Sequence, residues 1–218
     1  MPANRTKELY EDGVKHRDNT LQSYDFFLEN LGLESLEEFI DHKFPEGRQV
    51  NVLDIGCGNA GALGELKAKL GKRVHCMGLD FVDFQAGVDE KIIGNALEIE
   101  LPKADFIISF RALHEIGHVK EMLQKIAQAL LAQGKAVLSI RAMALVNGKL
   151  ELEESMRHED VQYLKELAVR EKLGNTILQG CRVHVELISQ RVQVENPETH
   201  AMETMHFLHG ATVLLEKG

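Results

Sequence analysis

The sequence predicts an α/β fold with a doubly wound sheet of seven strands, mostly parallel with an antiparallel last strand, preceded by an N-terminal helical cap. Between residues 50 and 140, short β-branched runs alternate with amphipathic helical segments. After residue 180, two strand-like runs follow each other without a clear helix between them, which favours an antiparallel ending. A chain of 218 residues favours one domain, expected over 1–218 with a cap at 1–47 and an α/β core at 48–218.

The N-terminal part of the chain predicts helices. Apolar residues recur at helical spacing from Lys7 to His42, Gly32 is expected to divide this stretch, and the turn-forming segment Phe44–Gly47 ends it. Its aromatic and histidine side chains have two open interpretations, a lid over a ligand pocket and ordinary core packing. These residues are Tyr10, His16, Tyr24 and Phe27.

Seven strands and three further helices follow in order. The strands are expected at Val50–Ile55, Val74–Leu79, Lys91–Ile93, Asp105–Phe110, Ala136–Ile140, Arg182–Val194 and Ala211–Leu215. The helices are expected at Ala60–Leu70, at about Val119–Leu131 and at about Glu159–Lys172, the first two closing near Gly71 and Gly134. The stretch 196–210 is ambiguous.

Composition and charge narrow the classes of function. The net charge of −9 argues against a protein that follows nucleic-acid phosphates over its whole surface, although a local basic patch is compatible with it. Three cysteines without regular spacing favour a reducing compartment over a disulfide framework. The polar segment Met1–Glu11 is not a secretory signal, and no apolar run approaches the roughly 20 residues of a membrane helix. We therefore expect a cytoplasmic protein without a membrane partner, of undetermined oligomeric state.

A glycine-rich turn joins the first strand to the first core helix, with the sequence Asp54-Ile55-Gly56-Cys57-Gly58-Asn59-Ala60-Gly61. Glycine allows torsions closed to other residues and lets a ligand approach the main chain. The helix that follows offers free N–H groups to a negative group such as a carboxylate. Tight turns also use glycine for steric reasons, so the turn alone is a weak signal.

Asp80, at the end of the second strand, strengthens this signal. Ligands of open α/β sheets lie beyond the carboxyl ends of the strands, and a carboxylate there can accept hydrogen bonds from both hydroxyls of a ribose. The alternative role is a cap of the following turn. The spacing between Gly56 and Asp80 favours the ribose-binding role for Asp80.

A dinucleotide site is the competing interpretation, because Gly56, Gly58 and Gly61 match the dinucleotide fingerprint. Asp54 argues against it, since a negative charge inside the strand is poorly placed near a pyrophosphate and suits a cationic ligand better. The antiparallel ending also differs from the usual dinucleotide fold.

The segment Val52–Gly58 resembles motif I of the class I S-adenosylmethionine-dependent methyltransferases, whose pattern is apolar-apolar-Asp-apolar-Gly-x-Gly. The resemblance covers about Val50 to Ile140 and implies a Rossmann-like fold with S-adenosylmethionine as cofactor. Two departures are the third glycine, which many members place at Ala60 and this chain at Gly61, and Asn95, where aspartate is common. The cofactor-binding residues that the resemblance implies are Asp54, Gly56, Cys57, Gly58, Asp80, Phe81, Asn95, Ala96 and Phe110, with Cys57 as a small packing residue.

The loop after the fourth strand carries the candidate catalytic residues, His114 and Glu115. Transfer from a sulfonium needs mainly positioning, and a general base helps only when the acceptor must lose a proton. In some small-molecule O-methyltransferases of this family a histidine followed by an acidic residue is that base, and this pair is similar. The alternatives are a structural histidine and a helix-start carboxylate.

The acceptor is expected to be a small molecule, methylated on oxygen or nitrogen. The Asn/Asp-Pro-Pro-aromatic motif of amino-directed nucleic-acid and glutamine methyltransferases is missing, as is a Pro-Cys nucleophile. Arg111 and Arg141 follow predicted strands and suit either an anionic acceptor or surface ion pairs. Two other classes stay open: an NAD(P)-dependent oxidoreductase, and a non-catalytic S-adenosylmethionine-binding module that serves a partner protein.

No metal site is expected. His200, Glu203, His206 and His209 are spaced three apart, which would place them on one face if this segment were a helix. No such helix is secure and no cysteine joins the group, so polar surface or pocket lining is the favoured interpretation.

Overall fold

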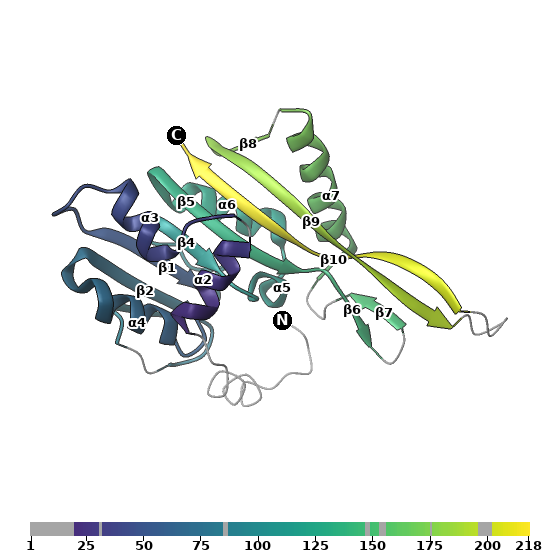
Figure 1. Ribbon diagram of the computed structural model, residues 1–218, viewed down its shortest axis with the longest axis horizontal. Coiled ribbons are helices and arrows are strands. Elements are labelled where there is room, and N and C mark those ends of the chain that lie inside the picture. The colour runs from purple at the N-terminus through teal and green to yellow at the C-terminus, as the bar shows by residue number, and fades with distance from the viewer. Residues whose placement is uncertain are drawn as a thin grey trace.

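The computed structural model describes residues 20–30, 32–84, 87–146, 149–152, 156–174, 176–195 and 202–218. Its main sheet has eight strands in the order β3-β2-β1-β4-β5-β10-β9-β8 (Figure 1). These strands are β1 (Val50–Ile55), β2 (Val74–Asp80), β3 (Glu90–Ile93), β4 (Ala104–Ser109), β5 (Leu130–Arg141), β8 (Ile177–Leu178), β9 (Cys181–Glu195) and β10 (Met202–Lys217). The helices are α2 (Leu21–Asn30), α3 (Leu36–Lys43), α4 (Gly61–Leu70), α5 (Leu113–Ile116), α6 (Val119–Ala129) and α7 (His158–Lys172), with a 3-10 turn at Gly71–Arg73.

The predicted topology is confirmed, with a correction to the strand number. Strands β1 to β5 pair in parallel, and β10 enters antiparallel between β5 and β9. The eighth strand, β8, has two residues and pairs with the start of β9. A strand of two residues is too short to show the alternation of apolar and polar residues that predicts a strand, which is why seven strands were expected.

The two faces of the sheet are covered by different helices, and alternation along β1 shows why. Val50 and Val52 join the core that includes the apolar residues of α2, α3 and α4, whereas Leu53 and Ile55 join the core that includes those of α6 and α7. Successive side chains of a strand point to opposite faces, so every buried parallel strand contributes to both cores. Asp54 therefore lies on the α2 face.

The N-terminal helices break where the sequence predicts. Gly32, with a φ of 67°, lies between α2 and α3, and Ser35 and Glu38 form a capping box that starts α3. Residues 7–19 of the expected helical cap lie outside the described part of the chain. Within the described helices, none is both long and apolar enough to cross a membrane.

Two features at the carboxyl edge of the sheet were not predicted. Strands β6 (Met143–Val146) and β7 (Lys149–Leu152) form an antiparallel hairpin, which the sequence marks only by Asn147-Gly148 between them. Strand β10 begins at Met202 and not near Ala211, so it pairs with β9 as a ribbon that projects beyond the body of the sheet (Figure 1). Much of the ambiguous stretch 196–210 is thus strand.

Candidate functional site

The glycine turn is shaped by two requirements at Gly56. Its φ is 75°, and a Cβ placed on it would lie 2.1 Å from the Cβ of Ala112 in the loop after β4. The N–H groups of Gly56 and Cys57 both donate to the carbonyl of Leu79, at 2.7 and 3.1 Å. These bonds fold the turn over the end of β2, beside the β4 loop.

The structure explains why glycine suits position 60, where many family members have their third glycine and this chain has Ala60. Ala60 has a φ of 54°, in the left-handed region that favours glycine, and it precedes the first turn of α4. Gly61 is not in that region; its N–H donates to the Asn59 side chain at 3.0 Å. A glycine at position 60 would relieve strain, whereas the glycine at 61 has no such role.

Asp80 connects three segments at the end of β2. Its Oδ2 accepts a hydrogen bond from the N–H of Gly58 at 2.8 Å, and its Oδ1 accepts one from Val82 at 3.2 Å. Its carbonyl accepts from the N–H of Gly94 at 2.9 Å. The carboxylate thus faces the glycine turn through Gly58, and through Val82 it also caps the turn that follows β2, which was the alternative role.

Asp54 is a completely buried carboxyl group next to this turn. Its Oδ2 accepts a hydrogen bond from the hydroxyl of Tyr24 on α2 at 2.7 Å, and Oδ1 has no hydrogen-bond partner among the described residues. Burial raises the pKa of Asp54 to about 7; the Tyr24 hydrogen bond opposes this rise and the charge of Asp80 adds to it. Near neutral pH, a cation beside Oδ1 would favour the ionised form.

The loop after β4 packs against both the turn and α2. The Ser109 hydroxyl donates to the Ile55 carbonyl at 2.8 Å and fixes the ends of β4 and β1 together. The Phe110 ring lies 5.6 Å from that of Tyr24 and 4.8 Å from that of Phe27, centroid to centroid. Arg111, at a strained φ of 59°, places its guanidinium 5.1 Å from the Phe110 ring. The result is an aromatic wall with a cation beside it.

His114 and Glu115 lie on α5, directly after this loop. His114 is buried, and its Nε2 lies 3.7 Å from Oε1 of Glu115. The two neighbours therefore do face each other, which adjacency in sequence did not guarantee. Arg141, the last residue of β5, lies at the same carboxyl edge of the sheet.

The remaining predicted cofactor residues follow Asp80, follow Gly94 or lie in the turn itself. Asn95 caps its own turn, accepting from the N–H of Leu97 at 3.1 Å and donating to Glu98 at 2.9 Å. Ala96 is buried and Phe81 is 39% exposed. Burial, aided by Asp54 and Asp80, raises the pKa of the Cys57 thiol, so the thiol stays protonated. A Cβ on Gly78 would lie 3.0 Å from that sulfur, which supports packing as the role of Cys57.

The metal hypothesis assumed that Glu203, His206 and His209 lie on a helix, and this assumption was wrong. The backbone of Glu203, His206 and His209 belongs to strand β10, and His200 lies outside the described residues. Over the described ranges, no three histidine, cysteine or acidic residues are grouped to hold a metal ion.

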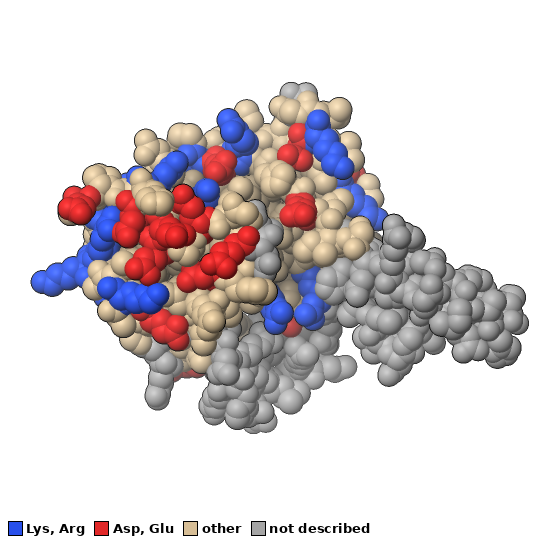
Figure 2. Space-filling model, viewed as in Figure 1, with Lys and Arg blue, Asp and Glu red and all other residues tan. Residues whose placement is uncertain are grey.

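The surface near α2 and α3 is acidic. Acidic side chains gather over these two helices in Figure 2, and Glu29, Glu34, Glu38 and Asp41 are exposed there. Such a face repels a polyanion.

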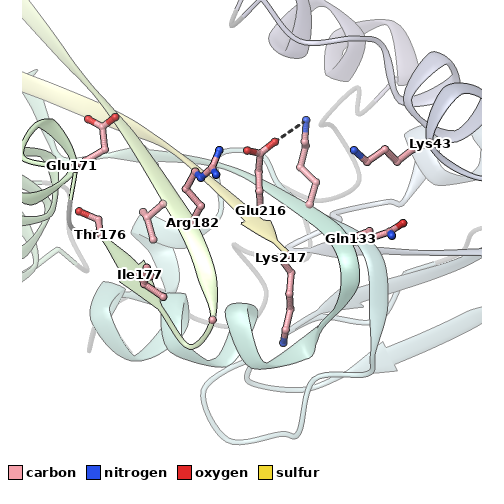
Figure 3. Close-up of a pocket in the computed structure, with 14 residues that line it drawn as sticks. Lys43, Gln133, Glu171, Thr176, Ile177, Arg182, Glu216 and Lys217 are labelled. Atoms are coloured by element: carbon pink, nitrogen blue, oxygen red, sulfur yellow. Dashed lines mark ion pairs between the residues drawn. The ribbon is translucent and has the colours of Figure 1, made fainter.

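An open groove of about 960 Å³ lies at the opposite edge of the sheet, where the parallel strands begin (Figure 3). Arg182 and Thr176 line it, and Lys135 pairs there with Glu216 at 3.3 Å. The groove contains none of the predicted site residues. Ligands of doubly wound sheets bind at the other edge, so this groove is not where the fold places a ligand.

The strand order defines the class of protein first. A mostly parallel sheet with one antiparallel strand inserted between β5 and β9 is the methyltransferase type of doubly wound α/β fold. The family follows from the sequence, because residues 22–176 match the model of a methyltransferase domain. The chain belongs to this methyltransferase family.

Two solved structures support the fold, and a third is reported beside them. The CurJ carbon methyltransferase matches with a TM-score of 0.51 and 15% identity over 94% of this chain and 57% of that chain. The CMeT domain of the citrinin polyketide synthase matches with a TM-score of 0.50 and 12% identity over 91% and 52%. The 1,6-didemethyltoxoflavin-N1-methyltransferase of Burkholderia thailandensis matches with a TM-score of 0.48 and 16% identity over 96% and 84%. No curated protein matches the sequence.

The structure brings together most residues that the sequence singled out. Asp54, Gly56, Gly58 and Asp80 meet at one turn, and the loop that leads to His114 packs against it. Sequence reasoning missed Ser109 as a link between strands and Tyr24 as a partner of Asp54. An isolated hydroxyl in the apolar run 105–110 was the available signal for Ser109.

Proposed function

We propose that the protein is an S-adenosylmethionine-dependent methyltransferase that acts on a small-molecule acceptor. The observation that carries the proposal is the pair of carboxyl groups, Asp54 and Asp80, on either side of a glycine turn that leaves no room for side chains at Gly56. In a member of a methyltransferase family, this arrangement fits the two polar ends of the cofactor.

The residues of the turn fit the cofactor in three respects. Asp54 offers a buried oxygen without a partner in the described chain, which suits the ammonium of the methionine end. Asp80 offers a carboxylate to the ribose hydroxyls. Ala96, on the segment after β3, is assigned to the adenine side of the same site. When bound, the cofactor supplies a methyl group already activated by its sulfonium.

The chain's own groups then orient the acceptor and remove its proton. The wall of Phe110 and Phe27 suits an apolar or aromatic acceptor, and Arg111 beside it suits a negative group on that acceptor. His114, held beside Glu115, takes the role of general base when the acceptor is a hydroxyl or a protonated nitrogen. The acidic surface over α2 and α3 supports a small acceptor over a nucleic acid.

The two other classes make different predictions. An NAD(P)-dependent oxidoreductase would tolerate loss of Asp54, whose negative charge is unfavourable near a pyrophosphate. A non-catalytic binding module would bind S-adenosylmethionine and transfer no methyl group to any acceptor.

Calorimetry tests the cofactor class directly. We expect binding of S-adenosylmethionine and of its demethylated product S-adenosylhomocysteine, and none of NAD. Asp80→Asn should weaken binding of S-adenosylhomocysteine roughly tenfold or more, because charged hydrogen bonds contribute about 1.5–3 kcal/mol. Asp83→Asn is the matched control, since Asp83 is exposed and pairs with Lys91. Binding of NAD alone, or equal affinity in the Asp80 variant, would overturn the assignment.

A further inference from the structure

We propose that Tyr24 is a positioning residue of the cofactor site, whose hydroxyl holds one oxygen of Asp54 so that the other receives the cofactor's ammonium group. This inference rests on the proposed function and adds α2 to the site. The family match begins at residue 22 and so includes α2, but no cofactor-binding residue that the resemblance implies lies on this helix.

Helix α2 is attached to both segments that border the glycine turn. The N–H of Leu21 donates to Oε2 of Glu65 on α4 at 2.9 Å, and α4 is the helix that follows the turn. On the other side, the rings of Tyr24 and Phe27 pack on Phe110 in the β4 loop. The helix therefore spans the methionine end of the proposed pocket, directly over Asp54.

The hydrogen bonds of Asp54 leave one place for a ligand. Tyr24 donates to Oδ2, and no described group donates to Oδ1, although both oxygens are buried. A buried carboxylate oxygen without a donor is unfavourable by about 1–3 kcal/mol. A ligand ammonium at Oδ1 would remove this penalty.

The charges around Asp54 favour a cation as that ligand. The described groups that act on Asp54 are Tyr24 from α2 and Asp80 from β2, and Cys57 from the turn acts on Tyr24. None of these is a lysine or arginine, so no cation of the described residues acts on the buried carboxyl group of Asp54. Such a site attracts a positive ligand and repels a phosphate.

The hydroxyl of Tyr24 has a role beyond packing. Its hydrogen bond favours the ionised form of Asp54 and so opposes the effect of burial on the Asp54 pKa. Tyr24→Phe keeps the ring on Phe110 and removes only this donor. The pKa of Asp54 should then rise further, and the carboxylate that binds the ammonium should form only at higher pH.

The test measures affinity for S-adenosylhomocysteine by calorimetry from about pH 5.5 to about pH 8.5, below the range where the ligand ammonium titrates. Wild-type affinity should rise with pH through about pH 7, where Asp54 is half ionised, and level off near pH 8. Tyr24→Phe should bind about tenfold more weakly at pH 7, with its rise displaced to higher pH. Tyr163→Phe, a half-buried tyrosine on α7, is the matched control and should behave as wild type.

Two further variants separate the hydroxyl from the docking of α2. Phe27→Leu loosens the contact with Phe110 without touching Asp54, so it should keep the wild-type pH profile. Asp54→Asn should bind weakly with little pH dependence, and adding Tyr24→Phe to it should change affinity by no more than about twofold. If Tyr24→Phe binds S-adenosylhomocysteine with the affinity and pH midpoint of the wild type, or with the same pH dependence as Phe27→Leu, this inference is overturned while the proposed function stands. Failure of the wild type to bind at any pH would overturn the proposed function and this inference with it.

Discussion

Replacing Asp54 by asparagine should stabilise the ligand-free protein, and the gain should grow with pH. Burial raises the pKa of Asp54 from 3.8 to about 7, so the folded state binds more protons than the unfolded state between these values. The contribution of Asp54 to stability is therefore greatest below about pH 4, falls as pH rises to about 7, and then stays low. At about 1.4 kcal/mol for each unit of pKa, the loss reaches roughly 4 kcal/mol.

Urea unfolding of the wild type and Asp54→Asn at pH 5 and pH 8 measures this effect. The free energy of unfolding of the variant should exceed that of the wild type by about 2.5 kcal/mol more at pH 8 than at pH 5. Asp83→Asn, on an exposed side chain, should follow the wild type at both values. If the Asp54→Asn and wild-type stabilities change in parallel with pH, the burial argument for Asp54 is wrong. A gain in stability joined to weaker S-adenosylhomocysteine binding would show that the carboxyl group serves the ligand and not the fold.

Three other predictions concern the turn, α7 and the candidate base. Gly56→Ala should destabilise the protein by about 2 kcal/mol more than Gly47→Ala in thermal or urea unfolding, because both have positive φ but only Gly56 adds a steric clash. Burial raises the pKa of Asp160, but hydrogen bonds led by that of Arg157 lower it overall. Asp160→Asn should therefore lower the free energy of unfolding by about 2 kcal/mol at pH 7, and by less as pH falls below about 4. Equal losses in the free energy of unfolding at pH 3 and pH 7 would contradict this prediction. His114→Gln should lower turnover with the true acceptor roughly tenfold or more while S-adenosylhomocysteine affinity stays unchanged; an unchanged rate would remove His114 from the mechanism.

The sequence predicted the elements whose pattern of apolar residues and glycines follows directly from their place in the fold. The run Val50–Ile55 has apolar residues on both faces because a central parallel strand is buried on both, and the contact with Ala112 requires glycine at position 56. Asp80 could be placed beside that turn because the carboxyl ends of neighbouring parallel strands meet at one edge.

Other parts depend on contacts that no local pattern records. Tyr24 has the spacing of an ordinary core residue, and only the docking of α2 on β1, thirty positions along the chain, reveals its bond to Asp54. Strand β8 is too short to show a period. The early start of β10 was ambiguous because this segment has neither a strict alternation nor a helical stripe, and pairing with β9 determines its conformation.

The position of β10 has a consequence for the order in which the molecule assembles. Strand β9 precedes β10 in the chain but reaches the sheet only through it, since β10 lies between β5 and β9. Strand β9 therefore cannot take its place in the sheet until β10 has paired with β5 over Gly210–Glu216, some 70 residues after β5 itself. Contacts so far apart in sequence form slowly, so the half of the sheet that carries the glycine turn should mature before the other.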